Sequence, residues 1–251
     1  MRRLGRIGAL ALAALASCAV AQDGTPCRSE NFRGVDYTLC EVDVAQADLR
    51  LFLYDESGAP FGHFSAVDRA LAEENTRLVF GMNAGMFHED RAPVGLYVED
   101  GREIRGLVEG ASPGNFGLVP NGVFCLREGR ADVMETSRFA ARRPDCRYAS
   151  QSGPMLVIDG ELHPRFLKDG SSVYVRNGVG TTSDGSRAVF VLSEAPVNFH
   201  QFGSFFRDHL GLPQALYFDG NVSRLHAPGL GRSDFGFSLG PIVGLVAPAG
   251  S

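Results

Sequence analysis

The chain of 251 residues contains no tryptophan and no extended run of lysine or arginine. Its 24 basic residues are outnumbered by 29 acidic residues, which gives a formal net charge of −5. Proteins that bind nucleic acids present clustered basic side chains, so this composition disfavours a nucleic-acid partner. The 31 glycines favour a loop-rich β or α+β fold.

Several signatures of hydrolases and metal sites are also missing. A Ser-His-Asp hydrolase is disfavoured because no nucleophile elbow is expected, and Gln151-Ser152-Gly153 does not supply one. The six histidines are scattered and no C-x₂-C or H-x₃-H spacing occurs, which disfavours zinc or a metal-dependent phosphodiesterase. We therefore expect no metal and no cofactor, although loop carboxylates leave a calcium site open.

The first 21 residues have the pattern of a signal peptide rather than of a folded segment. Three arginines and no acid precede a short apolar stretch over residues 7–16, which is too short to span a bilayer. Ala19-Val20-Ala21 fits a cleavage site, whereas Leu15-Ala16-Ser17-Cys18 resembles a lipobox that would leave Cys18 lipidated. Either processing route predicts export, to the periplasm or to an outer-membrane lipid anchor at Cys18. Losing the three arginines changes the net charge from −5 to −8.

Export places the remaining four cysteines in an oxidising compartment, where disulfides persist. Four cysteines allow three pairings. We expect Cys27–Cys40 and Cys125–Cys146, because each of these closes a short loop. Free buried thiols are the alternative.

The rest of the chain predicts one α+β domain over residues 27–249, with a mostly antiparallel or mixed β-sheet core and a few helices. Residues 37–44 and 49–54 have the pattern of a hairpin, and residues 138–144 that of a loop. Helices are expected from an N-cap at Ser65 to residue 74, and from an N-cap at Asn198 to residue 210. Further strands are expected over 77–82, 93–99, 155–158, 187–192, 215–218 and 242–246.

Polar groups follow several of these strands directly. The apolar segment 215–218 runs into Asp219, and then into Gly220 and Asn221, which favour a turn with positive φ. A carboxylate at a strand end stands at the rim of a sheet, where functional groups collect on loops. The chain is therefore expected to build a site around Asp219.

Six motifs resemble those of the phosphodiester glycosidase family, the domain also found in the lysosomal uncovering enzyme. They span residues 83–224, and they are Asn83-Ala84-Gly85-Met86-Phe87, Pro93-Val94-Gly95-Leu96, Asn121-Gly122-Val123-Phe124, Gln151-Ser152-Gly153-Pro154-Met155-Leu156, Arg176-Asn177-Gly178-Val179-Gly180 and Ala215-Leu216-Tyr217-Phe218-Asp219-Gly220. The resemblance implies a hydrolase that releases a sugar from a sugar phosphodiester. The uncovering-enzyme branch has a second glycine where this chain has Asn221, while Ser223 stays in register. The match is closest to an exported bacterial branch.

Three residues are the candidates for chemistry. Asp219 is the expected nucleophile or charge stabiliser, and Arg176 the expected phosphate clamp, because a planar guanidinium matches phosphate oxygens. Glu194 ranks first as a second carboxylate, ahead of Glu89 and Asp184.

A group of mostly neutral polar side chains at turns is expected to bind the sugar, since sugars are recognised by neutral donors and acceptors. His88 is included as a possible proton shuttle, and His200 is an alternative. The expected substrate-binding residues are Asn83, Asn121, Gln151, Ser152, Asn177, Asn221, Ser223 and His88.

The substrate class explains why a single carboxylate is enough. Ordinary glycosidases use two carboxylates. A phosphomonoester leaving group is already anionic, so it needs less protonation than an alcohol. The expected partner is a phosphorylated sugar or glycan of the cell envelope. The alternative is an envelope protein that binds such a glycan without cleaving it.

Overall fold

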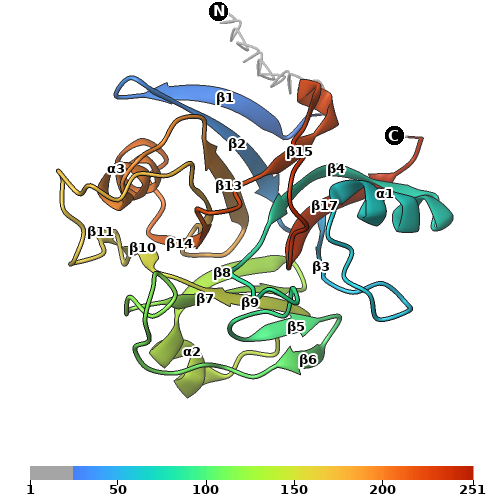
Figure 1. The fold of residues 1–251 in the computed structure, drawn as a ribbon, viewed down its shortest axis with the longest axis horizontal. Helices are drawn as coiled ribbons and strands as arrows, with labels where there is room; N and C mark the ends of the chain where they lie inside the picture. The colour runs from blue at the N-terminus through green and yellow to red at the C-terminus, as the bar shows by residue number, and fades with distance from the viewer. Residues whose placement is uncertain (1–24, 251) are drawn as a thin grey trace, which may run out of the picture.

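The computed structural model describes residues 25–250, which form three antiparallel β-sheets and a few short helices (Figure 1). The predicted signal peptide, including Cys18, lies outside the described residues. No helix within residues 25–250 is both long and apolar enough to cross a membrane.

The largest sheet has seven strands and carries the acid-bearing strand near its middle. Its spatial order is β1 (Cys27–Phe32), β2 (Val35–Asp43), β13 (Arg187–Ser193), β12 (Asn177–Thr181), β14 (Gln214–Asp219), β10 (Met155–Ile158) and β11 (Glu161–Leu162). Five of the six residues of β14 are buried, as expected for an apolar strand packed on both faces. Its last residue, Asp219, pairs with the first residue of β12, Asn177.

Two five-stranded sheets complete the fold. One has the order β16 (Arg232–Ser233), β15 (Leu225–Ala227), β4 (Thr76–Asn83), β17 (Ile242–Pro248) and β3 (Asp48–Phe52). The other has the order β6 (Arg102–Arg105), β5 (Tyr97–Glu99), β9 (Tyr148–Ser152), β7 (Gly122–Arg127) and β8 (Arg130–Glu135). The residues Asp100 and Gly101 between β5 and β6 both have positive φ, as an Asp-Gly hairpin turn requires.

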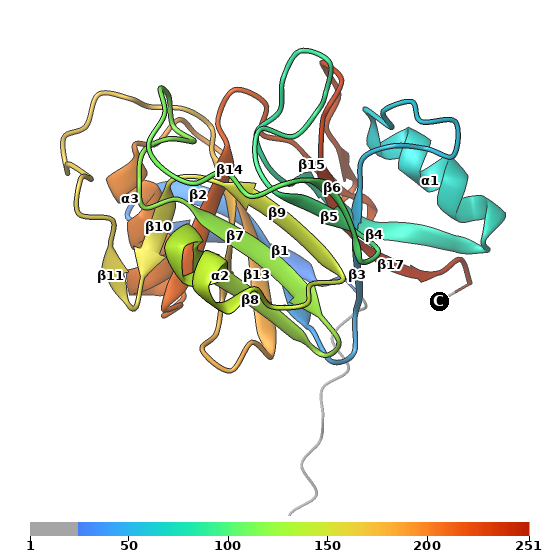
Figure 2. The ribbon, with the colours of Figure 1, turned by 90° about the horizontal axis from the view of Figure 1, so that it is seen from below.

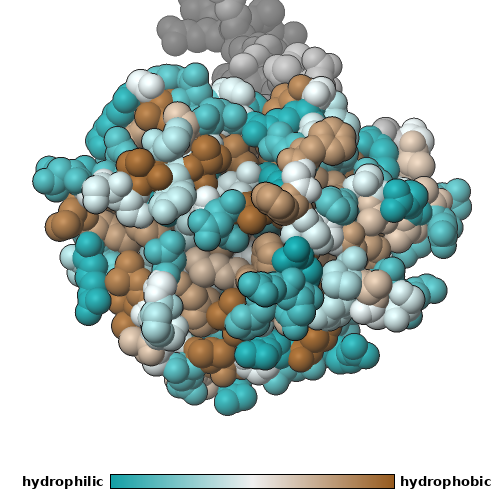
Figure 3. All heavy atoms as spheres, viewed as in Figure 1, coloured by the Kyte–Doolittle hydropathy of each residue, from teal (hydrophilic) through white to brown (hydrophobic). Residues whose placement is uncertain are grey.

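The three sheets share one core, so the expected single α+β domain is confirmed. The main buried cluster takes residues from each sheet, for example Phe190, Phe80 and Phe124, and the Phe190 ring contacts both of the others. Apolar and polar side chains are interspersed on the outer face seen in Figure 3. In Figure 2 the loops that follow β4, β6, β11 and β14 rise from the same edge of the molecule.

Both expected disulfides are confirmed. Cys27 and Cys40 stand directly opposite each other on β1 and β2, with a Cα–Cα distance of 4.0 Å. The second disulfide joins Cys125 on β7 to Cys146, which precedes β9. Each therefore links segments that are neighbours in one sheet.

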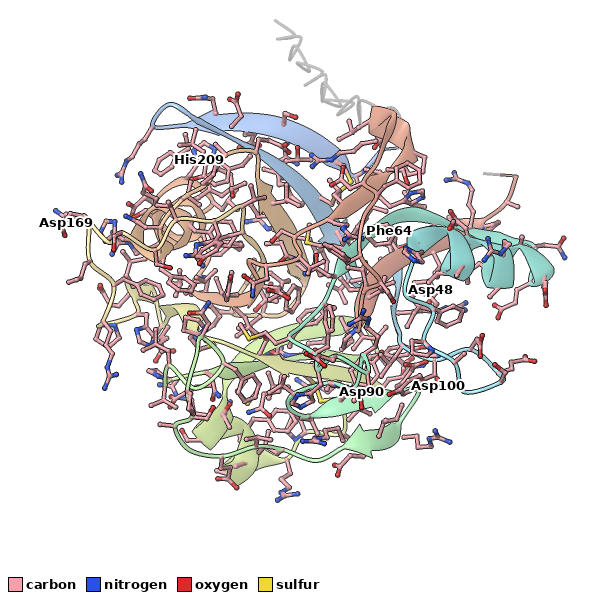
Figure 4. The ribbon with its side chains drawn as sticks, viewed as in Figure 1. Asp48, Phe64, Asp90, Asp100, Asp169 and His209 are labelled. Carbon is pink, nitrogen blue, oxygen red and sulfur yellow. A yellow bond between two sulfur atoms is a disulfide. The ribbon has the colours of Figure 1, made fainter. Side chains whose placement is uncertain are left out.

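The helix beginning at Asn198 is confirmed in detail. α3 (Phe199–Ser204) starts with a capping box, in which the Asn198 side chain accepts from the Gln201 N–H and Gln201 bonds back to Asn198. It continues as a π-helical turn, η1 (Phe205–His209), and Gly211 follows with φ 65°. His209 lies under the β1–β2 hairpin (Figure 4), with Nε2 2.5 Å from the Glu30 carboxylate.

Three local predictions were wrong. β2 and β3 do not pair as a hairpin, because β2 bonds to β1 and β13 whereas β3 bonds to β17. α1 (Phe64–Glu73) begins one residue before Ser65, and its N-cap is His63 without a side-chain bond. The expected loop over residues 138–144 is largely the helix α2 (Thr136–Arg142), which packs the side chain of Phe139 into a core cluster. The strand pairing and α2 both depend on contacts with other segments, which a local sequence pattern does not encode.

Candidate active site

A cleft of about 480 Å³ opens where four loops meet, and Asp219 stands in its wall. The loops come from β4, β6, β11 and β14, which are far apart in the sequence but adjacent in Figure 2. Most of the lining is apolar or neutral polar. The described lining residues are Met86, Phe87, Val94, Ser112, Pro113, Gly114, Asn115, Phe116, Ser172, Tyr174, Tyr217, Asp219 and Asn221.

Asp219 is the only charged side chain among these described lining residues. Its Oδ1 accepts the backbone N–H groups of Gly220 at 2.6 Å and Asn221 at 2.9 Å. The residue is 8% exposed, and burial raises the pKa of its carboxyl, although the backbone donors partly oppose this. The result is a desolvated carboxylate held in one orientation.

Glycine is required at position 220 because the side chains of Tyr217 and Tyr174 approach its backbone closely, not because its φ is positive. Neither Gly220 nor Asn221 has positive φ, so that part of the sequence interpretation was wrong. A Cβ on Gly220 would lie 2.1 Å from the Tyr217 hydroxyl and 3.3 Å from the Tyr174 Cβ. Any side chain here would push these tyrosines away from the carboxylate.

Asn83 and Asn177 are buried behind the cleft and hold the acid-bearing turn in place. Asn83 donates from Nδ2 to Asn177 Oδ1 at 3.2 Å, and Asn177 donates from Nδ2 to the Asn83 carbonyl at 2.7 Å. Asn177 Oδ1 also accepts the Asp219 N–H at 3.1 Å, and Asn83 Oδ1 accepts the Arg224 N–H at 2.9 Å. The pair therefore binds both ends of the turn over residues 219–224 rather than a sugar.

Three other predicted sugar ligands also serve the backbone. Gln151 bonds through its amide to Leu96, Val108 and Thr136. Asn121 donates to the Phe116 carbonyl, which fixes the loop carrying Phe116 into the cleft. Ser152 donates to the Phe218 carbonyl, next to Asp219. Since these groups are buried and bonded, they are supports of the cleft.

Of the remaining predicted substrate ligands, Asn221 is exposed and lines the cleft, so it is placed to meet a substrate. Ser223 turns inward, donating to the Asp219 or Val175 carbonyl. His88 follows Phe87 but is exposed and is not among the lining residues. His200 is half-buried at the start of α3 and lies outside the lining as well.

Arg176 lies behind the cleft wall, not in the cleft. Its side chain is 0% exposed. Nε donates to the Val197 carbonyl at 2.8 Å and Nη2 to the Ser172 carbonyl at 2.8 Å. The lining residues Ser172, Tyr174 and Tyr217 stand between this guanidinium and the cleft. A direct clamp on phosphate is therefore not formed in this arrangement.

Glu194 belongs to a different part of the surface. Its carboxylate accepts from Thr38 and forms an ion pair with Arg232. Both partners fix it beside β2, and it is not among the described lining residues. Glu89 and Asp184 are likewise not among them, so Asp219 carries the only carboxylate among the described lining residues.

Sequence reasoning missed several lining residues. Tyr217 precedes Asp219 by two positions, so strand alternation places both on one face of β14, and this signal was available. Gly110-Ala111-Ser112-Pro113-Gly114 spells G-x-S-x-G, and Ser112 lines the cleft. The segment is a loop between β6 and β7 rather than a strand-to-helix turn, and no histidine is among the described lining residues, so it is not a nucleophile elbow.

Within residues 25–250, no group of three or more histidine, cysteine or acidic side chains is arranged to hold a metal ion.

Comparisons with known proteins agree with the fold and with the six motifs. Residues 76–226 match the family described as phosphodiester glycosidase. The chain is 32% identical over 222 residues to the uncharacterized protein YigE of Escherichia coli strain K12, covering 88% of this chain and 84% of that protein.

Solved structures show the same fold at low sequence identity. The catalytic domain of zebrafish N-acetylglucosamine-1-phosphodiester alpha-N-acetylglucosaminidase, auto-inhibited by its pro-peptide, aligns with a TM-score of 0.60 and 13% identity over 87% of this chain and 81% of that chain. A putative exported protein from Burkholderia pseudomallei K96243 aligns with a TM-score of 0.55 and 11% identity over 84% and 74% of the two chains. With residues 76–226 matched and a 32% identical relative over most of its length, the chain belongs to the phosphodiester glycosidase family.

Proposed function

We propose that the protein is a hydrolase that cleaves a sugar-1-phosphodiester, releasing the free sugar and a phosphomonoester. The observation that carries this proposal is the single desolvated carboxylate of Asp219 in the wall of a mostly neutral cleft. A carboxylate with a raised pKa in a cleft is a candidate reactive group.

The reaction needs one group that stabilises positive charge at the anomeric carbon. The bond between the anomeric carbon and the phosphate oxygen breaks, and its electron pair leaves with the phosphate. Water supplies the hydroxyl of the sugar and a proton to solvent. Asp219 is the nucleophile or the charge stabiliser, and partial burial strengthens its attraction for an oxocarbenium-like centre. The two backbone N–H bonds to Oδ1 hold the carboxylate ready.

The remaining lining suits a sugar. The exposed side chains of Ser112, Asn115, Ser172 and Asn221 offer neutral donors and acceptors. Met86, Phe87 and Phe116 offer apolar surface for the faces of the ring. We further propose that the protein acts in the cell envelope after export, on a phosphorylated glycan, with a membrane link only if Cys18 is lipidated.

The test is turnover of methyl esters of sugar 1-phosphates by the purified protein, followed by the release of reducing sugar. We expect Asp219→Asn to lower kcat by at least about 10²-fold, as loss of one electrostatic catalytic group does. Asp169→Asn is the matched control, since Asp169 is exposed on the outer edge of the loop after β11 (Figure 4).

Wild-type rates in Asp219→Asn would refute the assignment. Substrate binding without release of sugar by the wild-type protein would instead favour a glycan-binding protein. Activity abolished by a chelator would favour a metal enzyme.

A further inference from the structure

Arg176 is a wholly buried cation without a carboxylate partner among the described residues. The hydrogen bonds of its side chain run to neutral oxygens, namely the Val197 carbonyl, the carbonyl and hydroxyl of Ser172, and the Tyr217 hydroxyl. Burial lowers the pKa of the guanidinium, which is the mark of a charge that has lost its hydration without gaining an anion. Buried charges are normally paired, so this one lacks a counter-ion.

Three aromatic rings enclose the guanidinium. Its Cζ lies 3.7 Å from the ring centroid of Phe199, 5.2 Å from that of Tyr217 and 5.5 Å from that of Tyr174. Ring faces attract a cation, so they keep the guanidinium in place without neutralising it. Tyr174 and Tyr217 are also walls of the cleft, so the enclosure borders the site of Asp219.

Two polar groups at this border are buried side by side, the Arg176 guanidinium and the hydroxyl of Tyr217. The guanidinium hydrogen-bonds the hydroxyl and opposes the rise that burial causes in the pKa of Tyr217. A guanidinium can only donate, so the hydroxyl accepts from it and its own O–H is left without an acceptor among the described residues. The hydroxyl also lies against Gly220, the residue after Asp219. A buried donor without an acceptor is costly, which makes this hydroxyl a candidate ligand site.

The cleft also requires a cation that its lining does not provide. A phosphodiester is anionic, and the only charged residue among the described lining residues is itself an anion. The Cζ of Arg91 lies 5.5 Å from the ring centroid of the lining residue Phe87, but its Nη1 donates to the Glu89 carbonyl and Arg91 itself is not among the described lining residues.

We propose that the Tyr217 hydroxyl donates a hydrogen bond to a non-bridging phosphate oxygen of the substrate, with Arg176 supplying the compensating positive charge from behind it. This inference rests on the proposed function and names the residues that select a phosphodiester over an ordinary glycoside. Tyr217 touches the phosphate, and Arg176 is a positioning residue. Entry of the phosphate requires displacement of Tyr174, which is 45% exposed and packs beside Gly220.

The test compares two tyrosines by the same substitution, one in the cleft and one outside it. Binding of inorganic phosphate is measured by calorimetry for wild type, Tyr217→Phe and Tyr54→Phe, since Tyr54 is not among the described lining residues. We expect Tyr217→Phe to raise the Kd for phosphate, and the KM for a sugar-1-phosphodiester, at least tenfold. We expect Tyr54→Phe to stay within twofold of wild type in both quantities, and Arg91→Met to do the same.

The substitution Tyr217→Phe also removes the hydrogen bond between the hydroxyl and Arg176. Phosphate binding is therefore compared at a temperature at which wild type and variant are both folded by circular dichroism. Unchanged phosphate affinity in the folded variant would overturn the proposal.

A second measurement avoids substitution effects. 3-Fluorotyrosine placed at position 217 should show a ¹⁹F shift on addition of phosphate, and no such shift would overturn the proposal. Phosphate binding by Tyr217 without any turnover would refute the proposed function and leave this inference standing. If Tyr217→Phe turned over the substrate with the KM and the phosphate Kd of wild type, this inference would be refuted and the proposed function would stand.

Discussion

Asp219 shows how burial of one carboxyl group lowers the stability of the fold when that group is ionised. Its Oδ1 is fixed by two N–H donors, yet burial outweighs them and raises the pKa of the carboxyl. The folded state therefore binds a proton to this group more tightly than the unfolded state does. Its contribution to stability is lost as pH rises from the unfolded pKa, about 3.9, through the folded value.

This sign predicts an unusual variant. At pH 7 we expect Asp219→Asn to be at least as stable as wild type, because the amide resembles the protonated acid and carries no charge to desolvate. The two proteins should converge in stability near pH 3. Urea unfolding at both pH values measures this. A clear loss of stability at pH 7 would mean that the ionised carboxylate supports the fold.

The residue scale also shows where the sequence was informative about the site. Asp219 and Asn221 were predicted in the cleft from their place after a strand, and both line it. Asn83, Asn177 and Gln151 were also predicted to line the site, but their side chains bond to other parts of the protein. A buried turn needs hydrogen-bond partners just as a bound substrate does. The presence of an amide in a motif therefore does not reveal whether it binds the backbone or the substrate.

At the scale of elements, the sequence was most informative where one segment decides its own structure. The capping box at Asn198 and the apolar spacing of residues 199–210 require no partner to be recognised. By contrast, β2 and β3 follow each other closely but enter different sheets, and residues 138–144, which the local pattern predicts as a loop, lie largely in α2. Those outcomes depend on packing against distant segments.

The Asn83–Asn177 pair joins β4 to β12, and it predicts a linked loss of stability and activity. Asn177→Ala removes the Asn177 partner of the Asp219 N–H, of Asn83 Nδ2 and of the Asn83 carbonyl, at a cost of about 1–3 kcal/mol. It also frees the Asp219 end of the turn that carries the carboxylate, while Asn83 still accepts the Arg224 N–H at the other end, so kcat should fall as well.

Asn31→Ala is the control, because Asn31 is exposed and bonds to Asp36 on the β1–β2 hairpin. Denaturant unfolding and turnover are compared for both variants. If Asn177→Ala were destabilised but fully active below its unfolding transition, the pair would support the fold alone.

The whole molecule assembles the cleft from four loops belonging to three sheets. The sequence predicted that distant segments meet around Asp219, but not which of their side chains reach the cleft. Arg176 illustrates the reason. It precedes β12 in a motif that matches phosphate chemistry, yet Phe199 of α3 and the two tyrosines cover it. Its burial depends on residues as distant in the chain as Tyr217, on β14.

Removing each of the two disulfides tests whether the geometry of the cleft depends on these cross-links. They close loops with sequence separations of 13 and 21 residues, for which chain entropy predicts about 3 kcal/mol each. We expect paired Cys→Ala replacement at either bridge to lower the free energy of unfolding by this amount. Loss of the Cys125–Cys146 pair should lower the free energy of unfolding slightly more, because its loop is longer.

No cysteine is among the described lining residues, so kcat at temperatures where the protein stays folded should not change. Urea unfolding with parallel turnover assays measures both. A variant that remains folded by circular dichroism but loses turnover would show that the bridges position Asp219 as well as stabilise the sheets.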